Sequence, residues 1–572
     1  MAPTPRLPGR RLALAVGVWT ARRLREEWLG SAPYAWTAPR PDGLGAQPRD
    51  FRPADPEAGR RILAGAFVLA GATLTVGPRG DPWDRPSPDR RFAVALHRFG
   101  WLRDLLATGG EGVTEGLRLA LEWRRVFAGW NSFVWGPEVL ERRVFNLACA
   151  ARQVCAGASE AETALIAGDL ARQVRVLLDQ GGRPARAAER ACAAAVGAAA
   201  LSGPAAERLL ARALARLERA LEATVPEDGG HATRSPEAAL ELLFDLQTLD
   251  EALTQLARPT PEGALRAIDR LSTSVRALTL ADGSLVSLQG GDACSPAYVA
   301  AARAGEDVAG RPVPHACNGY QRLDGGTLQA VVDAAAPAAG PWSVSACGQP
   351  LALELAAGTK RLVVGSGWSP DGGGHEALRV ADAASTLNIA DLPCGEPLRG
   401  FRAAALGARL VDACGPVTAE RRDGPDAVWL ELAHDGWVRP FGLRHERRLY
   451  LDAAAGELRG EDRLTALRAA KGEDRRFIPF TVRFHLAPDV SALIARDRKS
   501  VLLKPEGDEA GWWLRSDALE VALEPSVHHQ AGEVRRTQQI VLRGQARADS
   551  GARVRWKLSS AAAAVDPKGP DA

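Results

Sequence analysis

The chain lacks several residue patterns that mark common sites. None of its eight cysteines belongs to a C-x-x-C pair, the spacing typical of zinc ribbons and thioredoxin-like redox sites. Several cysteines lie in alanine-rich apolar stretches, which favours small buried thiols. The even count also permits disulfides if the protein is exported. We see no zinc constellation in the sequence and predict no metal site.

Signature motifs of several enzyme classes are also missing. The chain has no GxSxG, P-loop or HExxH motif, and no GxGxxG in a strand-turn-helix context. Its formal net charge of +3 is close to zero for 572 residues. The composition therefore gives no reason to predict a nucleic-acid partner.

No apolar run is long enough to span a bilayer, including the one near the N-terminus. That segment, "GRRLALAVGVWTARR", also lacks a clear cleavage site for a signal peptide. Two interpretations stay open: an ordinary packed first helix, or an amphipathic helix that rests on a membrane surface. The second interpretation rests on Trp19, Trp28, Arg22, Arg23 and Arg25.

The first half of the chain repeats apolar residues at helical spacing. Two such faces are Leu209, Ala213, Leu217 and Leu221, and Leu242, Leu246, Leu249 and Leu253. Ser159 with Glu162 predicts a capping box, and the Ser235-Pro236 and Thr260-Pro261 pairs each predict an N-cap followed by proline. Many antiparallel helices joined by short turns are expected.

After residue 325 the apolar period becomes two, which predicts the strands of an antiparallel sandwich. Alternating segments are 351–355, 480–486, 519–523 and 554–558. The predicted domains are an N-terminal extension at 1–54, a helical domain at 55–280, a connector at 281–325, a β-sandwich at 326–558 and a flexible tail at 559–572.

The order of these segments, together with specific sequence stretches in them, resembles the heparinase II/III-like polysaccharide lyases of the alphaproteobacterial type. The stretches are "LAGAFVLAG", "ALHRFGWLRDL", "WNSFVWGPEVLERRVFNL", "EDGGHATRSPE", "NGYQRLDGGTLQAVVDAA", "PLALELAAGTKRLVVGSGW", "STLNI", "VRFHLAP" and "RRTQQIVLRG". The resemblance implies an N-terminal (α/α) toroid followed by a C-terminal antiparallel β-sandwich. It also implies an acidic polysaccharide in the cleft between them, cleaved by β-elimination beside a uronic acid.

That reaction has three chemical requirements. A cationic or hydrogen-bonding group must neutralise the sugar carboxylate, a base must take the neighbouring proton, and an acid must protonate the leaving oxygen. His231 and Arg234, beside the start of a helix at Pro236, are predicted to hold the carboxylate, and His231 is also a catalytic candidate. The alternative is that Arg234 pairs with a nearby acid such as Asp228 and that His231 only packs the turn.

The other predicted site residues are less constrained by the pattern. Tyr320 and His375 are the candidates for proton transfer, and Asn318 and His485 are candidates for substrate contact. The alternatives are that Tyr320 packs the first strand, that His375 is a solvated loop residue and that His485 lies on a surface salt-bridged face.

Several residues that the resemblance implies are replaced here. Ala238 and Ala239 stand where active relatives carry Tyr or Tyr-His, and Ala384 stands where a histidine often precedes "STL". Ala346 and Cys347 replace an expected histidine before the strand at 351–355. Zinc occurs in the family, but its ligand positions are not retained here, so we predict no cofactor.

The leading hypothesis is a polysaccharide lyase acting on a uronic-acid-containing glycan. The alternative is a catalytically degenerate member that binds envelope glycan or serves as a structural or assembly factor. Glycosidic hydrolysis ranks last because no carboxylate pair stands out. The location is open between the cell envelope, where the family is found, and the cytoplasm, and the oligomeric state is not predicted.

Overall fold

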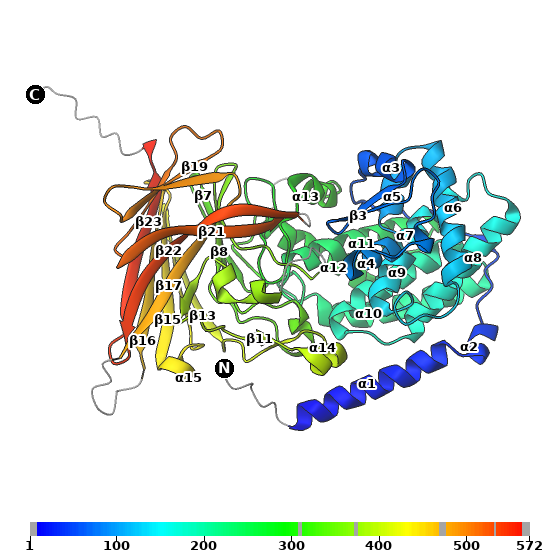
Figure 1. The fold of residues 1–572 in the computed structure, drawn as a ribbon, viewed down its shortest axis with the longest axis horizontal. Coiled ribbons are helices and arrows are strands. Elements are labelled where there is room, and N and C mark those ends of the chain that lie inside the picture. Colours follow the sequence, from blue (N-terminus) through cyan, green and yellow to red (C-terminus); the bar gives the residue numbers. More distant parts are fainter. Residues whose placement is uncertain (1–8, 307–311, 371–375, 468–475, 531–532, 563–572) are drawn as a thin grey trace, which may run out of the picture.

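A computed structural model shows a helical half and a β-sheet half that lie side by side (Figure 1). The order is the predicted one, an (α/α) toroid followed by an antiparallel β-sandwich. The described residues are 9–306, 312–370, 376–467, 476–530 and 533–562. Within the described residues no helix is long and apolar enough to cross a membrane.

The helical half is built from antiparallel helices packed around α9, which contacts α7, α8, α10 and α11. Eight of the thirteen α9 residues are alanines, all of them buried except Ala187, and such small side chains let the surrounding helices approach closely. A Cβ at Gly197 would lie 2.6 Å from Val174 Cγ2. The helices are α3 (Pro56–Leu63), α4 (Arg90–Arg98), α5 (Trp101–Leu106), α6 (Gly110–Phe127), α7 (Pro137–Val154), α8 (Glu160–Asp179), α9 (Ala187–Ala199), α10 (Pro204–Thr224), α11 (Pro236–Gln255) and α12 (Glu262–Ala277).

The predicted helix starts are mostly confirmed. Ser159 and Glu162 form a capping box at α8, and Ser235 caps α11 by accepting from the Ala238 N–H at 3.3 Å. The predicted Thr260 cap is wrong by one residue, because Pro261 occupies the N-cap of α12. Both predicted apolar faces, on α10 and α11, are buried.

The N-terminal extension packs against both halves. Its helices are α1 (Gly9–Leu29) and α2 (Ala32–Trp36), and β1 (Gly43–Leu44) pairs with β4 (Leu201–Ser202) of the helical half. Helix α1 runs along the outside of the molecule to α14 (Gly400–Leu406), a helix of the β half (Figure 1). The Trp19 and Phe401 rings meet there with centroids 6.3 Å apart. A small hairpin of β2 (Ala66–Leu69) and β3 (Ala72–Thr75) follows α3.

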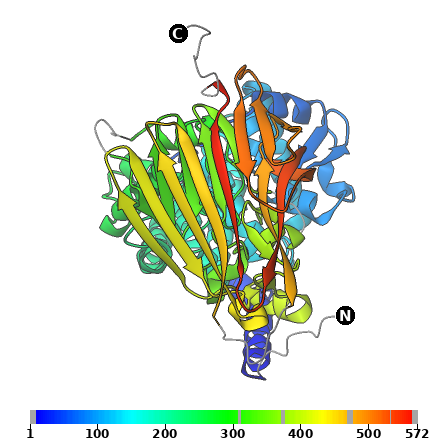
Figure 2. The ribbon, with the colours of Figure 1, turned by 90° about the vertical axis from the view of Figure 1, so that its left-hand side faces the viewer.

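The β half contains two antiparallel sheets that face each other (Figure 2). The first, with the order β21-β22-β17-β9-β8-β7-β6-β5, comprises β5 (Ala316–Cys317), β6 (Tyr320–Gly325), β7 (Leu328–Asp333), β8 (Leu353–Ala357), β9 (Lys360–Val364), β17 (Phe477–Leu486), β21 (Glu520–Gln530) and β22 (Glu533–Arg547), with β10 (Leu387–Ile389) beside β17. The second, with the order β13-β14-β15-β16-β23-β20-β19-β18, comprises β13 (Val417–Asp423), β14 (Ala427–His434), β15 (Leu443–Asp452), β16 (Glu457–Ala466), β18 (Val490–Ile494), β19 (Ser500–Pro505), β20 (Trp512–Ser516) and β23 (Ala552–Ser560). Short elements at the edge are β11 (Glu396–Pro397), β12 (Leu410–Val411) and α15 (Val438–Phe441).

Strands β7 and β8 of the first sheet are buried on both faces, and successive residues of each strand point to opposite faces. Val332 and Leu355 belong to the core between the two sheets, whereas Val331 and Ala356 belong to the core of the helical half. This explains why β8 is buried at every position. It corrects the prediction of a half-buried strand at 351–355, because Glu354 is buried as well.

The boundaries differ from the predicted ones in two places. The predicted connector at 281–325 contains α13 (Pro296–Arg303) and strands β5 and β6, so the sheet begins at Ala316. Leu519, predicted to face the core, is exposed because β21 starts one residue later. Most of the predicted tail, residues 563–572, lies outside the described residues.

Candidate functional site

The turn that carries His231 and Arg234 lies between α10 and α11, against the start of the first sheet. Gly229 and Gly230 have φ of 92° and 78°, and a Cβ at Gly230 would lie 2.7 Å from Asn318 Cβ. Glycine is therefore required both by the backbone conformation and by the close approach of Asn318. The Ser235 hydroxyl donates to the Gly290 carbonyl at 3.1 Å, which fixes the turn to the segment that precedes the sheet.

Arg234 is buried at the junction of the two halves, and all of its hydrogen-bonding capacity is used. A guanidinium carries five N–H donors. Nε donates to Asn318 O (3.2 Å), Nη1 to Ala335 O (3.1 Å) and Ala336 O (2.9 Å), and Nη2 to Gly319 O (3.0 Å) and Asp333 Oδ1 (2.6 Å). Arg234 therefore pairs with an acid, as the alternative stated, but the acid is Asp333 and not Asp228, which accepts from the Asn318 N–H at 2.8 Å. Arg234 also has a positive φ of 64°, rare for a non-glycine residue.

The charge of Arg234 is stabilised inside the protein. Burial disfavours the charged guanidinium, but Asp333 and Tyr320 outweigh this effect and hold the pKa of Arg234 above its ordinary value. Asp333 is held in turn by Gln289, whose Nε2 donates to Asp333 Oδ2 at 2.6 Å. The Arg234–Asp333 pair therefore joins the turn before α11 to the end of β7.

Tyr320 lies directly beside Arg234 and is 2% exposed. Its hydroxyl donates to the Arg234 carbonyl at 2.7 Å, and the Arg234 guanidinium carbon lies 4.8 Å from its ring centroid. Burial raises the pKa of Tyr320 well above its ordinary value of 10. The residue belongs to the apolar core of the helical half, which is the packing alternative of the sequence analysis.

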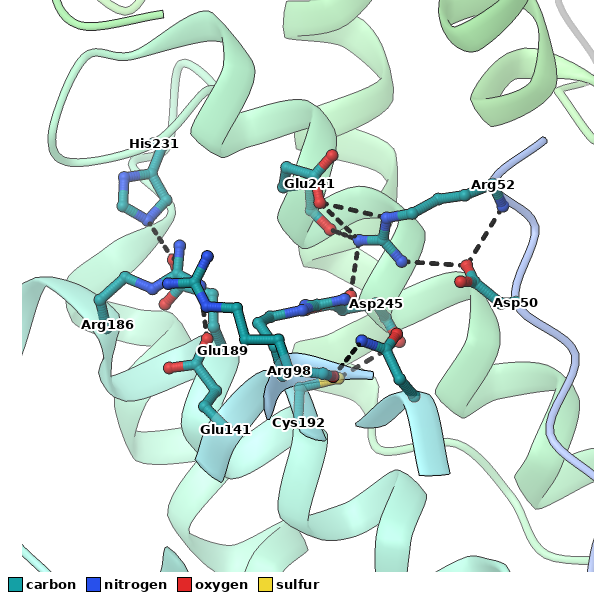
Figure 3. Close-up of polar contacts among 12 residues, drawn as sticks. Asp50, Arg52, Arg98, Glu141, Arg186, Glu189, Cys192, His231, Glu241 and Asp245 are labelled. Atoms are coloured by element: carbon teal, nitrogen blue, oxygen red, sulfur yellow. Dashed lines mark hydrogen bonds and ion pairs between the residues drawn. The ribbon is translucent and has the colours of Figure 1, made fainter. Parts of the chain in front are cut away.

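His231 is fully buried and points toward Glu189 of the helical half (Figure 3). Its Nδ1 accepts from the Thr233 N–H at 3.1 Å, so Nε2 carries the proton and lies 3.4 Å from Glu189 Oε1. Burial raises the pKa of Glu189, but Arg186 and His231 outweigh that effect and lower it to about 2. The ring also meets Trp342 edge-on, with centroids 6.1 Å apart. His231 thus takes part in a buried ionic cluster.

The other predicted site residues are separated from one another. The Asn318 amide donates to the His231 carbonyl at 3.0 Å and so braces the turn. His485 on β17 is 3% exposed, which corrects its predicted place on a polar surface. Its ring nitrogens contact Ser526 Oγ at 2.7 Å and the Asp382 carbonyl at 2.9 Å, and burial lowers its pKa to about 4. His375 lies outside the described residues.

A second charged cluster in the helical half was not predicted from the sequence. Arg52, in the N-terminal extension, contacts Glu241 Oε2 and Asp245 Oδ1 at 2.9 and 2.7 Å (Figure 3). Arg142 also pairs with Asp245, at 2.7 Å, and the Tyr298 hydroxyl donates to Glu241 Oε1 at 2.5 Å. The sequence did contain a signal for this cluster: Glu241 and Asp245 are spaced i, i+4 in the apolar helix α11, which places both acids on one face of the helix.

Hollows on the described surface lie elsewhere. One is lined by the ends of β18 and β19, between Pro488 and Glu509, and another by α6 residues such as Leu117 and Arg125. Neither is lined by a residue predicted for the site.

The comparisons with known proteins agree with this architecture. The profile of the family "Heparinase II/III-like, C-terminal" matches residues 312–557. FtsZ-localized protein C of Caulobacter vibrioides (strain NA1000 / CB15N) is 50% identical over 565 residues, 97% of either chain. Among solved structures, heparinase III aligns with a TM-score of 0.63 at 14% identity over 85% of this chain and 80% of its own. A mutant of heparan sulfate lyase HepC from Pedobacter heparinus aligns with a TM-score of 0.57 at 14% identity over 96% of this chain and 88% of its own.

Proposed function

This chain belongs to the heparinase II/III-like lyase family, and we propose that within it the chain is a non-catalytic assembly factor that localises with FtsZ. The 50% identity to FtsZ-localized protein C extends over nearly the whole of both chains, so both halves are covered. The localisation part of the proposal rests on that likeness. The non-catalytic part rests on the geometry around Arg234.

The observation that carries the non-catalytic part is the saturation of Arg234. To stabilise a developing carbanion beside a uronate, a cation must offer donors to the sugar carboxylate. All five Arg234 donors are already directed to Asp333 and to backbone carbonyls. A carboxylate bound there would have to displace Asp333, a buried anion that would then be left unpaired.

The tyrosines that could serve as the catalytic base are also engaged in other contacts. Besides Tyr320, the chain has Tyr34, whose hydroxyl donates to Asp179 Oδ2 at 2.7 Å, and Tyr298, whose hydroxyl donates to Glu241. Tyr450 stacks on Trp429 with centroids 4.8 Å apart in the second sheet, remote in the fold from the helical half. None of these contacts places a phenol beside Arg234 with its oxygen available to accept a proton.

Two of the positions that differ from active relatives are closed by packing. Ala346 and Ala384 are 0% and 1% exposed, so each is enclosed by the surrounding structure. The Ala346 carbonyl accepts from Arg379 Nε at 2.9 Å, and this buried arginine lies 4.8 Å from the Trp368 ring centroid. These contacts support a role for this region in rigid packing.

The proposed localisation is tested with a fluorescent fusion in cells that carry labelled FtsZ. The wild-type chain is expected to coincide with FtsZ and to disperse when FtsZ is depleted. Tyr320→Phe keeps the ring and removes only the hydroxyl, so it is expected to localise normally. A fusion that spreads evenly while FtsZ is assembled, in a strain where it is intact by immunoblot, contradicts the proposal.

The second candidate is the polysaccharide lyase that the family suggests, acting on a uronic-acid-containing glycan in the cell envelope. It is tested by following the absorbance of new carbon–carbon double bonds during incubation with a panel of uronate polymers. Turnover by the wild-type chain that Tyr320→Phe abolishes supports this candidate. Turnover that both proteins share indicates a contaminating lyase.

Helix α1 supports a peripheral position at a membrane surface. Leu14, Leu24 and Trp28 on this helix are each more than half exposed, and arginines at positions 22, 23 and 25 lie on the same helix. Apolar side chains beside basic ones are typical of helices that lie in the interface of anionic membranes. In vesicle flotation, Leu24→Glu is expected to weaken binding to anionic vesicles, whereas Leu265→Glu, at another exposed leucine on α12, is expected to leave it unchanged. Equal flotation of both variants contradicts this role.

A further inference from the structure

Two cysteines and a histidine come together at the edge of the β half, far from the junction turn in sequence. Cys394 follows β10, Cys414 precedes β13, and His434 is the last residue of β14. Their Sγ atoms and one imidazole nitrogen all lie within 4.8 Å of one another, and all three residues are buried. We propose that Cys394, Cys414 and His434 bind a zinc ion through two thiolates and one imidazole nitrogen.

The distances suit this metal. Tetrahedral zinc with bonds of about 2.3 Å to sulfur separates two sulfur ligands by about 3.8 Å. The side chains therefore need to move inward by no more than about an ångström to close around the ion. Two thiolates balance the double charge of zinc, so the occupied site buries no net charge. Thiolate and imidazole ligands together favour zinc over magnesium or calcium, which prefer oxygen.

The orientation of His434 identifies Nδ1 as the ligand atom. A Cβ built on Gly436 would lie 3.0 Å from His434 Nδ1 and 2.8 Å from Cys394 Sγ, so Nδ1 and the thiol face the same small space. Nδ1 accepts the Gly436 N–H at 3.1 Å, so its single lone pair points toward that donor. A metal bound at Nδ1 would take this lone pair and displace the Gly436 N–H from it.

Behind His434 lies the kind of hydrogen-bond relay that supports metal-binding histidines. With Nδ1 as an acceptor, His434 Nε2–H donates to His445 Nδ1 at 3.1 Å. His445 Nε2–H then donates to Asp462 Oδ1 at 2.9 Å, and Arg447 Nε holds the same oxygen at 2.8 Å. Trp556 Nε1 donates to the other oxygen of Asp462 at 3.0 Å. The relay fixes the histidine tautomer and increases the electron density on Nδ1.

The absence of a side chain at Gly436 is the third feature of the site. The same Cβ would lie 2.9 Å from Cys414 Cβ, closer than real Cβ contacts come. The φ of Gly436 is not in the left-handed region, so backbone conformation does not demand glycine there. Glycine is needed there because a side chain would collide with the two cysteines.

The site closes the base of the segment 394–414, which includes β11, α14 and β12. Helix α1 packs against α14 through the contact of Trp19 with Phe401. A metal at the base would fix the orientation of α14, and through it the position of α1. The sequence analysis did not predict this site because the three residues stand at 394, 414 and 434, with no short ligand spacing.

The test is metal content and spectroscopy on the full-length, reduced protein. We expect one zinc per chain by elemental analysis. After zinc removal, Co²⁺ is expected to give the thiolate-to-cobalt charge-transfer band and the visible bands of a tetrahedral site. Cys394→Ser and Cys414→Ser should each lose these bands. Cys347→Ser, a buried cysteine of the same half, is the matched control and should keep them.

A second variant addresses the relay without touching a ligand. His445→Gln is expected to weaken zinc binding by roughly 10- to 100-fold, measured by competition with a chromophoric chelator. Chelation of the wild-type metal should also speed hydrogen exchange in α14. The proposal is overturned if reduced, folded protein takes up neither zinc nor cobalt. It is also overturned if the chain isolated from cells carries a Cys394–Cys414 disulfide, detected as a mass lower by two hydrogen atoms.

Discussion

The two faces of the first sheet show how one structural element serves two different interfaces. The face toward the second sheet is apolar, with Leu353 and Leu355 packed in the sandwich core. The face toward the helical half carries Asp333 and Glu354, both buried and both paired with arginine. Apolar burial is non-directional, whereas a buried ion pair fixes the partners' positions. The polar face therefore sets how the two halves join.

The junction contains a second tie of the same kind. Glu354 Oε1 accepts from the Ser287 N–H at 2.9 Å, and Glu354 Oε2 pairs with Arg361 at 2.5 Å. Arg361 reaches on to Asp282 Oδ1 at 2.9 Å, in the segment that leads from α12 to the sheet. These contacts and the Arg234–Asp333 pair lie at the junction of the two halves, where the resemblance implied a substrate cleft.

The largest expected effect on this comparison is that of Arg234→Ala. The substitution leaves Asp333 as an unpaired buried anion and several carbonyls without donors, so we expect a loss of about 3–5 kcal/mol in the free energy of unfolding. Urea unfolding followed by circular dichroism measures it. Arg266→Ala, which removes an exposed arginine paired with Glu262, is the control and should change stability by less than about 0.5 kcal/mol. If the two variants lost similar amounts of unfolding free energy, the buried ion pair at the junction would be no more important for stability than an exposed one.

The second effect concerns the coupling of Glu354 with Arg361. Glu354→Gln removes the charge and keeps the size, and we expect a loss of roughly 2–3 kcal/mol. A double-mutant cycle with Arg361→Met should show that the double variant loses much less than the sum of the single losses. Additive losses would mean that the two side chains do not act as a pair.

A smaller effect is expected for Tyr320→Phe. The change removes one hydrogen bond, from the Tyr320 hydroxyl to the Arg234 carbonyl, and keeps the packed ring. We expect a loss of about 1 kcal/mol, seen as a small shift in the thermal midpoint. A loss as large as that of Arg234→Ala would show that the hydroxyl has a further partner.

The last expected effect is a pH dependence from His485, which is confined to acidic solution. Burial lowers its folded pKa to about 4 from an ordinary 6.5, so the histidine is neutral when folded and takes up a proton on unfolding between these values. Its contribution is therefore fully present above about pH 6.5 and is lost as the pH falls toward 4. His485→Gln should make the stability curve flatter in this window, by up to about 1.4 kcal/mol per pH unit. An unchanged slope contradicts the assignment.

The sequence predicted the fold well because periodic patterns report which face of an element is buried. The apolar faces of α10 and α11 and the inward residues Val554, Trp556 and Leu558 of β23 are buried as expected. The pattern failed where both faces of a strand are covered. In β8 and β17, Glu354 and His485 look like solvent-facing residues, yet each is buried against chain from a distant part of the sequence.

The candidate site was predicted only in part. The words around His231 and Arg234 correctly marked a turn at the junction, and Tyr320 and Asn318 do lie against it. No local pattern could reveal that the Arg234 guanidinium pairs with Asp333, which lies 99 residues further along the chain. The same limit applies to Cys394, Cys414 and His434, which only tertiary structure brings together.

The most direct test of the account is the elimination assay on uronate polymers, run on wild type and Tyr320→Phe after both have been shown to be folded. The account predicts no double-bond absorbance from either protein on any polymer, since Arg234 has no donor to offer a substrate. Sustained product formation by the wild type that disappears in Tyr320→Phe would contradict it, because the junction would then be an active site.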